Sequence, residues 1–203
     1  MIIDPADLDP QSLYKLLIGS VVPRPIAWTS SVSREGTRNL APFSFFTVAS
    51  RQPPMLCISL GPPPETEAGS ERSAKDTLSN IEETREFVIN IVSVHLSNKM
   101  YESSKNYPPE ADEFEKAGLT PAPCEVVGPP RVGEAGVSME CVLDRAIQLG
   151  SDHLLIGRMV RFHVRDELYQ NGRIDVAGLD PLGRLAGNYT KIETIFELPA
   201  DNL

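Results

Sequence analysis

Short segments with an alternating or continuously apolar pattern follow one another along the chain, and proline and glycine separate them. This arrangement is typical of β-strands joined by turns. The predicted strands cover residues 24–33, 38–50, 55–60, 87–94, 137–149, 154–164 and 188–198. The second of them is interrupted near Pro42. Six or seven strands with mostly short connections indicate a closed or nearly closed antiparallel barrel.

The first two strands form a predicted hairpin. Arg34, Glu35 and Gly36 are expected at its tip, where Gly36 adopts a positive φ. Side chains of a strand point alternately to its two faces. In the first strand we therefore expect one face with Ile26, Trp28, Ser30 and Val32, and another with Ala27, Thr29 and Ser31.

A few helices are predicted between the strands. Asp9 and Pro10 supply a cap and a first-turn proline for a helix over residues 11–18, with an apolar face of Leu13, Leu16 and Leu17. The clearest helix covers residues 73–86, because Ser73 and Asp76 form a capping-box-like start. Shorter helices are predicted over residues 95–104 and around residues 112–117.

Residues 105–130 form a long, loop-rich excursion. In a compact domain such an excursion is usually a lid, a dimer arm or a binding loop. The chain contains no internal repeat and no low-complexity tract. We therefore expect one domain over residues 1–203, mainly β with a few helices.

Composition and charge exclude several classes of protein. Hydrophobic residues make up 41% of the chain, which is typical of globular domains. The formal charge is −9, whereas nucleic-acid-binding proteins need a basic surface, so no nucleic acid is expected. The chain has no apolar run of about 20 residues, which a membrane span requires, and its first ten residues do not resemble a signal peptide. A cytoplasmic protein without a membrane partner is therefore expected.

Motifs for metals and nucleotides are missing from the sequence. The three cysteines have no spacing typical of a disulfide framework or a zinc site, so each is expected to be a small buried apolar residue: Cys57, Cys124 and Cys141. The histidines are scattered, and no metal site is expected from them: His95, His153 and His163. Neither the dinucleotide-binding glycine motif nor the phosphate-binding P-loop is present.

Residues 39–47 and 53–60 form the first candidate binding region. Asparagine, serine and threonine alternate with aromatic residues in the interrupted strand. A planar heteroaromatic ligand would need this combination of apolar surface and edge hydrogen bonds. A bulged core strand, in which Phe43, Phe45 and Phe46 only fill the barrel, explains the same pattern.

The predicted helix start at residues 72–77 is the second candidate. Its backbone N–H groups and helix dipole favour an anion, and Arg72, Lys75 and the hydroxyls of Ser73 and Thr77 would complete a phosphate site. A capped helix with solvated basic residues explains these residues equally well, since capping and phosphate binding use the same residue types.

Several segments together resemble the flavin reductase-like family, and within it the flavoredoxin branch of FMN-binding split barrels. The matching segments are Pro23–Ser30, Asn39–Phe46, Lys75–Thr77, Asn80–Ile81, Glu86–Ile91, Asp152–Val160 and Pro181–Tyr189. Ser151 replaces a glycine of the family pattern. The segments occur in order over most of the chain, from about Leu13 to Tyr189.

The resemblance implies a Greek-key antiparallel split β-barrel that forms a homodimer and holds FMN near the dimer interface. It implies contacts to the flavin ring from Thr29, Asn39, Leu40, Ala41, Ser44 and Ser59. It implies contacts to the phosphate from Arg72, Lys75 and Thr77. Asn90 and Tyr189 are further neighbours, and His153 is expected near a nicotinamide without acting as an acid or base.

The resemblance also implies an oxidoreductase that transfers a hydride from NADH or NADPH to FMN and passes electrons onward. The acceptor would be a free flavin, a partner monooxygenase, a redox protein or a small molecule. No catalytic side chain is expected, because the flavin supplies the reactivity. The acidic excursion, with Asp112 and Glu113, favours NADH or no nicotinamide. An FMN-binding electron carrier that does not oxidise nicotinamides is the alternative, and a flavin-free structural barrel is a third interpretation.

Overall fold

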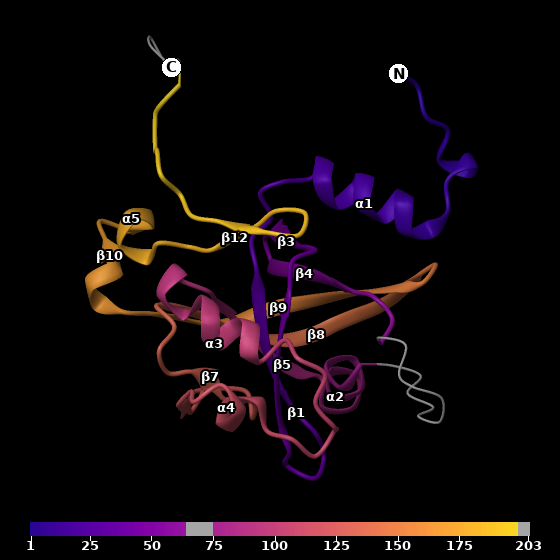
Figure 1. The fold of residues 1–203 in the computed structure, drawn as a ribbon. Helices are drawn as coiled ribbons and strands as arrows, with labels where there is room; N and C mark the ends of the chain where they lie inside the picture. The colour runs from indigo at the N-terminus through magenta and orange to yellow at the C-terminus, as the bar shows by residue number, and fades with distance from the viewer. Residues whose placement is uncertain (64–74, 199–203) are drawn as a thin grey trace.

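The computed structural model describes residues 1–63 and 75–198 (Figure 1). Its helices are α1 Pro10–Ser20, α2 Asp76–Thr84, α3 Ser97–Glu102, α4 Glu113–Lys116 and α5 Val176–Leu179. Its long strands are β1 Ala27–Val32, β2 Arg38–Phe43, β3 Phe46–Arg51, β4 Pro54–Leu60, β5 Glu86–Ile91, β8 Val137–Leu149 and β9 Asp152–Val164. Short strands are β6 Pro121–Ala122, β7 Arg131–Val132, β10 Tyr169–Gln170, β11 Arg173–Ile174, β12 Gly183–Arg184 and β13 Tyr189–Thr190.

The seven long strands form one antiparallel sheet in the order β2-β1-β5-β8-β9-β4-β3. Its two edge strands, β2 and β3, are joined by only Ser44 and Phe45. Because this connection spans about 11 Å at most, the sheet must curve until its edges meet at one end. The predicted mainly β fold and nearly closed antiparallel barrel are confirmed.

The interruption expected near Pro42 lies two residues later. Pro42 belongs to β2, where it is paired with Trp28 of β1. A proline is tolerated there because β2 is an edge strand, so the missing N–H can face away from the neighbouring strand. The strand ends after Phe43.

Two hydrophobic cores lie on opposite faces of β1. Ala27 belongs to the core inside the barrel, whereas Trp28 belongs to a second core with Phe114 of α4 and Met100 of α3. Leu78 of α2 packs into the barrel core. The predicted alternation along β1 is therefore confirmed, although both faces of the strand are buried.

The helix predicted over residues 11–18 is present as α1, and the Asp9 carboxylate caps it. Its apolar face is only partly covered within the chain: Leu13 is half-buried, whereas Leu16 and Leu17 are 45% and 53% exposed. Figure 1 shows α1 standing away from the barrel at the upper right. None of the helices in the described parts of the chain has the length and apolar character needed to cross a bilayer.

The helix predicted over residues 73–86 begins later, at Asp76, with Lys75 as its N-cap residue. Lys75 makes no side-chain cap hydrogen bond. The proposed cap Ser73 and the candidate Arg72 lie outside the described residues. The helix ends at Thr84, and its C-cap residue Arg85 adopts the left-handed conformation with φ 66°.

The strand predicted over residues 188–198 is wrong for most of its length. Only Tyr189 and Thr190 form a strand, and they pair with β12. Residues 191–198 have no regular structure, and Ile195 and Phe196 are exposed. Alternation alone does not make a strand, because a strand also needs a neighbour to satisfy its backbone groups.

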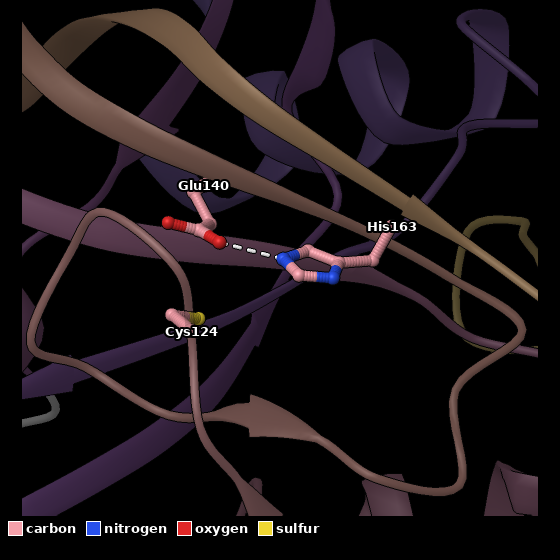
Figure 2. A group of neighbouring side chains, drawn as sticks. All are labelled: Cys124, Glu140 and His163. Atoms are coloured by element: carbon pink, nitrogen blue, oxygen red, sulfur yellow. Dashed lines mark hydrogen bonds and ion pairs between the residues drawn. The ribbon is translucent and has the colours of Figure 1, made fainter.

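Glu140 of β8 fastens the 105–130 excursion to the sheet. Its side chain is fully buried, and His163 of β9 donates to it over 2.6 Å (Figure 2). The main-chain N–H groups of Glu125, Val126 and Val127 also donate to its carboxylate, at 2.7–3.1 Å. Burial alone would raise the pKa of Glu140, but these hydrogen bonds outweigh it and lower the pKa to about 2.

A side chain at position 157 would disrupt the barrel core. A Cβ atom there would overlap Cζ of Phe87 and lie 3.3 Å from Cβ of Cys141. We expect Gly157→Ala to lower the free energy of unfolding by about 1–3 kcal/mol, measured by urea denaturation. Gly187→Ala, where a Cβ would meet no atom within 4 Å, is the control and should change stability little.

Removing the Glu140 charge should destabilise the protein in a pH-dependent way. We expect Glu140→Gln to lower the free energy of unfolding by about 2–3 kcal/mol at neutral pH, because hydrogen bonds to a buried charge are lost. The pKa of Glu140 is lower in the folded state than its usual 4.5, so its contribution is present above pH 4.5 and is lost as the pH falls toward about 2.

The measurement is denaturant unfolding of both proteins as a function of pH, in which the difference between them should shrink on acidification. Glu125→Gln, an exposed change on the same segment, is the control. A difference that stays constant between pH 4.5 and about 2 would contradict this role of the Glu140 charge.

Candidate functional site

A pocket lies where the end of β2, the start of α2 and the 103–107 segment meet. Its lining includes Asn39, Ala41, Phe43, Lys75, Thr77 and Glu113. Pro42 and Phe43 provide an apolar wall, and the first turn of α2 provides backbone N–H groups without intrahelical acceptors. The pocket therefore combines an apolar surface with an anion-attracting helix start.

A second pocket adjoins the first, between the barrel and α1. It is lined by Ser44 and Ser59 together with Tyr14 of α1 and Asp152 of β9. Both pockets are lined by Pro42, Phe43 and Lys75. The interrupted strand and the helix start, which the sequence presents as two separate candidates, thus form one continuous region.

Lys75 lies at the junction of the two pockets. Its Nζ is 5.4 Å from the ring centroid of Phe43, which is within the range of a cation–π contact. Burial lowers the pKa of Lys75, and the Asp152 carboxylate acts in the opposite direction. A half-buried cation beside an aromatic ring is suited to an anionic group of an otherwise apolar ligand.

The structure separates the predicted ring-binding residues into two groups. Asn39 and Ala41 line the first pocket, and Ser44 and Ser59 line the second. Thr29 and Leu40 are fully buried instead. Thr29 is paired with the pocket residue Ala41 in the sheet, and the Leu40 side chain belongs to the second core.

The predicted phosphate-binding residues Lys75 and Thr77 both lie at the start of α2 and line the first pocket. The Thr77 hydroxyl donates its proton to Asn39 Oδ1 over 2.7 Å. A hydroxyl has a single proton, so Thr77 retains its main-chain N–H as the donor for an anion. Arg72 lies outside the described residues.

The residues expected as further neighbours have other contacts. Asn90 is fully buried, and its amide bonds the Trp28 carbonyl, the Val132 N–H and the Ser138 hydroxyl. These contacts give Asn90 a role in the interior of the fold. The ring centroid of Tyr189 is 4.4 Å from Cζ of the Arg184 guanidinium. Tyr189 lines a pocket that Ser44 also lines.

The expected nicotinamide neighbour, His153, is half-buried at the start of β9. It is paired with Leu60 and Gln148 in the sheet. Its neighbour Asp152 lines the second pocket.

Sequence reasoning missed Glu113 as a pocket residue. Glu113 is only 7% exposed, and its carboxylate accepts the Leu40 N–H at 3.1 Å and Asn39 Nδ2 at 3.3 Å. Burial raises the pKa of Glu113, and these hydrogen bonds oppose the rise. The only local signal was Asp112, which caps α4 by accepting the Phe114 N–H; nothing in the spacing connects Glu113 to β2.

Cys124, Glu140 and His163 bring potential metal ligands within 4.8 Å of one another (Figure 2). The Glu140 carboxylate already accepts four hydrogen bonds. Burial and the Glu140 charge raise the pKa of the Cys124 thiol to about 11, so the thiol is protonated near neutral pH. Glu140 therefore serves to hold the excursion on the sheet, and we assign no metal to this cluster.

The cysteines are all free thiols, and only one of them matches the expectation of full burial. Cys141 is buried in the barrel core, whereas Cys57 and Cys124 are partly exposed.

Solved structures of similar sequence share this architecture. Nitrilotriacetate monooxygenase component B from Bacillus cereus is 43% identical, with a TM-score of 0.90 and 98% of each chain covered. The 2-nitrobenzoate 2-nitroreductase of Pseudomonas fluorescens is 29% identical, with a TM-score of 0.85, covering 100% of this chain and 98% of the other. Both proteins are named for oxidation–reduction chemistry.

The split-barrel fold is confirmed by a split-barrel protein from Shewanella frigidimarina, with a TM-score of 0.83 at 22% identity over 98% of this chain and 99% of the other. The Flavin reductase like domain family matches residues 18–192, which is most of the chain. The family suggested by the sequence motifs is thus confirmed. The chain belongs to the flavin reductase-like domain family.

Proposed function

We propose that this protein is an FMN-binding oxidoreductase that takes electrons from a reduced nicotinamide and passes them to an acceptor. The observation that carries the proposal is the joining of the β2 end, the α2 start and Lys75 in one continuous pocket region. Membership of a flavin reductase-like family supports a flavin as the ligand of this region.

The residues present fit FMN. Ala41, Pro42 and Phe43 offer an apolar wall for a planar ring, and Lys75 with the first turn of α2 offers positive potential for a phosphate. Bound FMN supplies the redox chemistry, and the chain's own residues bind and orient it. Ser44 and Ser59 add hydroxyl groups in the second pocket.

Acidic side chains near the pocket favour NADH as the electron donor. Asp112 and Glu113 give the excursion beside the first pocket a negative charge. That charge disfavours the additional phosphate of NADPH. The names of the similar structures, a monooxygenase component and a nitroreductase, support a partner monooxygenase or a small organic molecule as the electron acceptor.

The exposed apolar residues of the N-terminal region support a homodimer. Tyr14, Leu16 and Leu17 of α1 are about half exposed, and Val48 of β3 is 64% exposed. Apolar surface of this kind is typical of interaction sites. Since Tyr14 and Leu17 also line the second pocket, a dimer interface over α1 would lie next to the proposed flavin site.

Lys75→Glu should weaken FMN binding strongly, because it replaces a half-buried cation at the proposed phosphate site with an anion. We expect a loss of about 2–3 kcal/mol, the usual contribution of a charge-assisted contact. Quenching of FMN fluorescence on titration with protein measures the affinity. Lys191→Glu makes the same charge change at an exposed position and should leave the affinity unchanged. Equal FMN affinity of folded Lys75→Glu and wild type would refute the phosphate assignment.

Anaerobic mixing with nicotinamides tests the reaction. The FMN-loaded protein should show oxidised flavin absorbance that bleaches with NADH, and more slowly with NADPH, measured by visible spectroscopy. Bleaching by dithionite but by neither nicotinamide would favour the alternative of an electron carrier. Failure of the purified protein to bind added FMN would contradict the proposed function itself.

A further inference from the structure

A buried network of amide, hydroxyl and carboxylate groups lies beside the first pocket. Asn39 is at its centre, and its Oδ1 accepts the hydroxyls of Thr77 at 2.7 Å and Ser31 at 3.3 Å. Asn80 Nδ2 in turn donates to the Ser31 hydroxyl over 3.2 Å. On its other side, Asn39 Nδ2 donates to Glu113 Oε1 over 3.3 Å. The network connects β1, β2, α2 and α4.

Among the groups of the described residues that bind the Asn39 side chain, only the Glu113 carboxylate is restricted to one role, that of a hydrogen-bond acceptor. The hydroxyls of Thr77 and Ser31 can donate or accept, and an asparagine amide can present either end after a 180° rotation. An ionised carboxylate can only accept. Glu113 therefore holds the NH₂ end of Asn39 toward itself, and this orientation makes both hydroxyls donate to Oδ1.

Glu113 is itself held in place by main-chain and helix contacts. The Leu40 N–H donates to its Oε2 over 3.1 Å, so the two carboxylate oxygens have different partners. The adjacent Asp112 binds the guanidinium of Arg38, with 2.6 Å between Arg38 Nε and Asp112 Oδ2. Consecutive acidic residues at the start of α4 thus bind consecutive residues of β2.

We infer that Glu113 is a positioning residue which sets the hydrogen-bonding polarity of the pocket by forcing Asn39 to present N–H rather than C=O. Asn39 Nδ2 has two N–H groups, and one of them is bound to Glu113. Asn39 also lines the pocket, and its second N–H is the donor that we assign to the ligand. The inference rests on the proposed function for its ligand: the ring carbonyls and the phosphate of FMN are hydrogen-bond acceptors, which a donor at position 39 favours.

Glu113→Gln tests the inference with little change in shape. The new amide keeps an oxygen for the Leu40 N–H and turns its NH₂ toward Asn39, which then rotates to present Oδ1. Because the hydroxyls of Thr77 and Ser31 can accept as well as donate, both can accept from the rotated Asn39 amide. We expect a nearly unchanged melting temperature and an FMN dissociation constant about tenfold higher.

Asp112→Asn is the matched control. It makes the same chemical change one residue earlier and removes the ion pair with Arg38, while asparagine still caps α4. Its FMN affinity should equal that of wild type. Riboflavin, which lacks the phosphate, is titrated in parallel: a loss in Glu113→Gln for FMN alone places the Asn39 donor at the phosphate, and a loss for both places it at the ring.

A double-mutant cycle tests the polarity by stability measured without flavin, and then by FMN affinity. Asn39→Asp alone puts two carboxylates opposite each other and should lower the melting temperature strongly. Adding Glu113→Gln restores the wild-type charge and lets glutamine donate to Asp at position 39, so stability should recover. FMN affinity should stay low in the double variant, because position 39 then presents only acceptors. A purely structural role would restore stability and binding together.

The outcomes separate the inference from the function that it rests on. Wild-type FMN affinity in Glu113→Gln, or additive stability effects in the cycle, would overturn the role of Glu113. Absence of FMN binding by wild type would instead overturn the proposed function, and non-additive stability in the cycle would still establish the direct Asn39–Glu113 contact on which the polarity depends.

Discussion

The structure depends on the requirement that polar groups buried beneath the 105–130 excursion find hydrogen-bond partners. Two buried carboxylates, one on the sheet and one on the excursion, provide these hydrogen-bond partners. Glu140 projects from the sheet and receives main-chain N–H groups of the excursion, whereas Glu113 projects from the excursion and receives the N–H of Leu40 on the sheet. These contacts hold the excursion on the barrel and cover part of the β2 edge, whose unpaired backbone would otherwise be exposed.

The pocket is a consequence of that arrangement. Its wall from β2 is continuous with the barrel, its cationic side comes from the start of α2, and Glu113 comes from α4. Arg24 stabilises the region around the β2–β3 connection, next to the pocket. Its guanidinium donates to Ser44 Oγ, to the Ile18 and Val21 carbonyls at the end of α1, and to the Leu185 carbonyl. Segments distant in sequence therefore define one surface.

The differences between sequence expectation and structure have physical causes. The apolar face of α1 was recognisable from Leu16 and Leu17, but periodicity does not reveal whether a partner surface exists within the same chain. Alternation at residues 188–198 predicted a strand that finds no neighbour beyond Thr190 in the described residues. Thr29 and Leu40 carried the family resemblance, and the structure shows both side chains to be fully buried.

The sequence by itself determined the long strands of the sheet, the hairpin turn at Gly36, the helix start near Lys75 and the family, because these features depend on local periodicity, turn chemistry and ordered motifs. Only the tertiary structure decided which polar residues meet. Glu113 and Asn39 are 74 positions apart, and Glu140 and His163 are 23 apart. No pattern within a segment encodes such contacts, because they arise from how the excursion packs on the curved sheet.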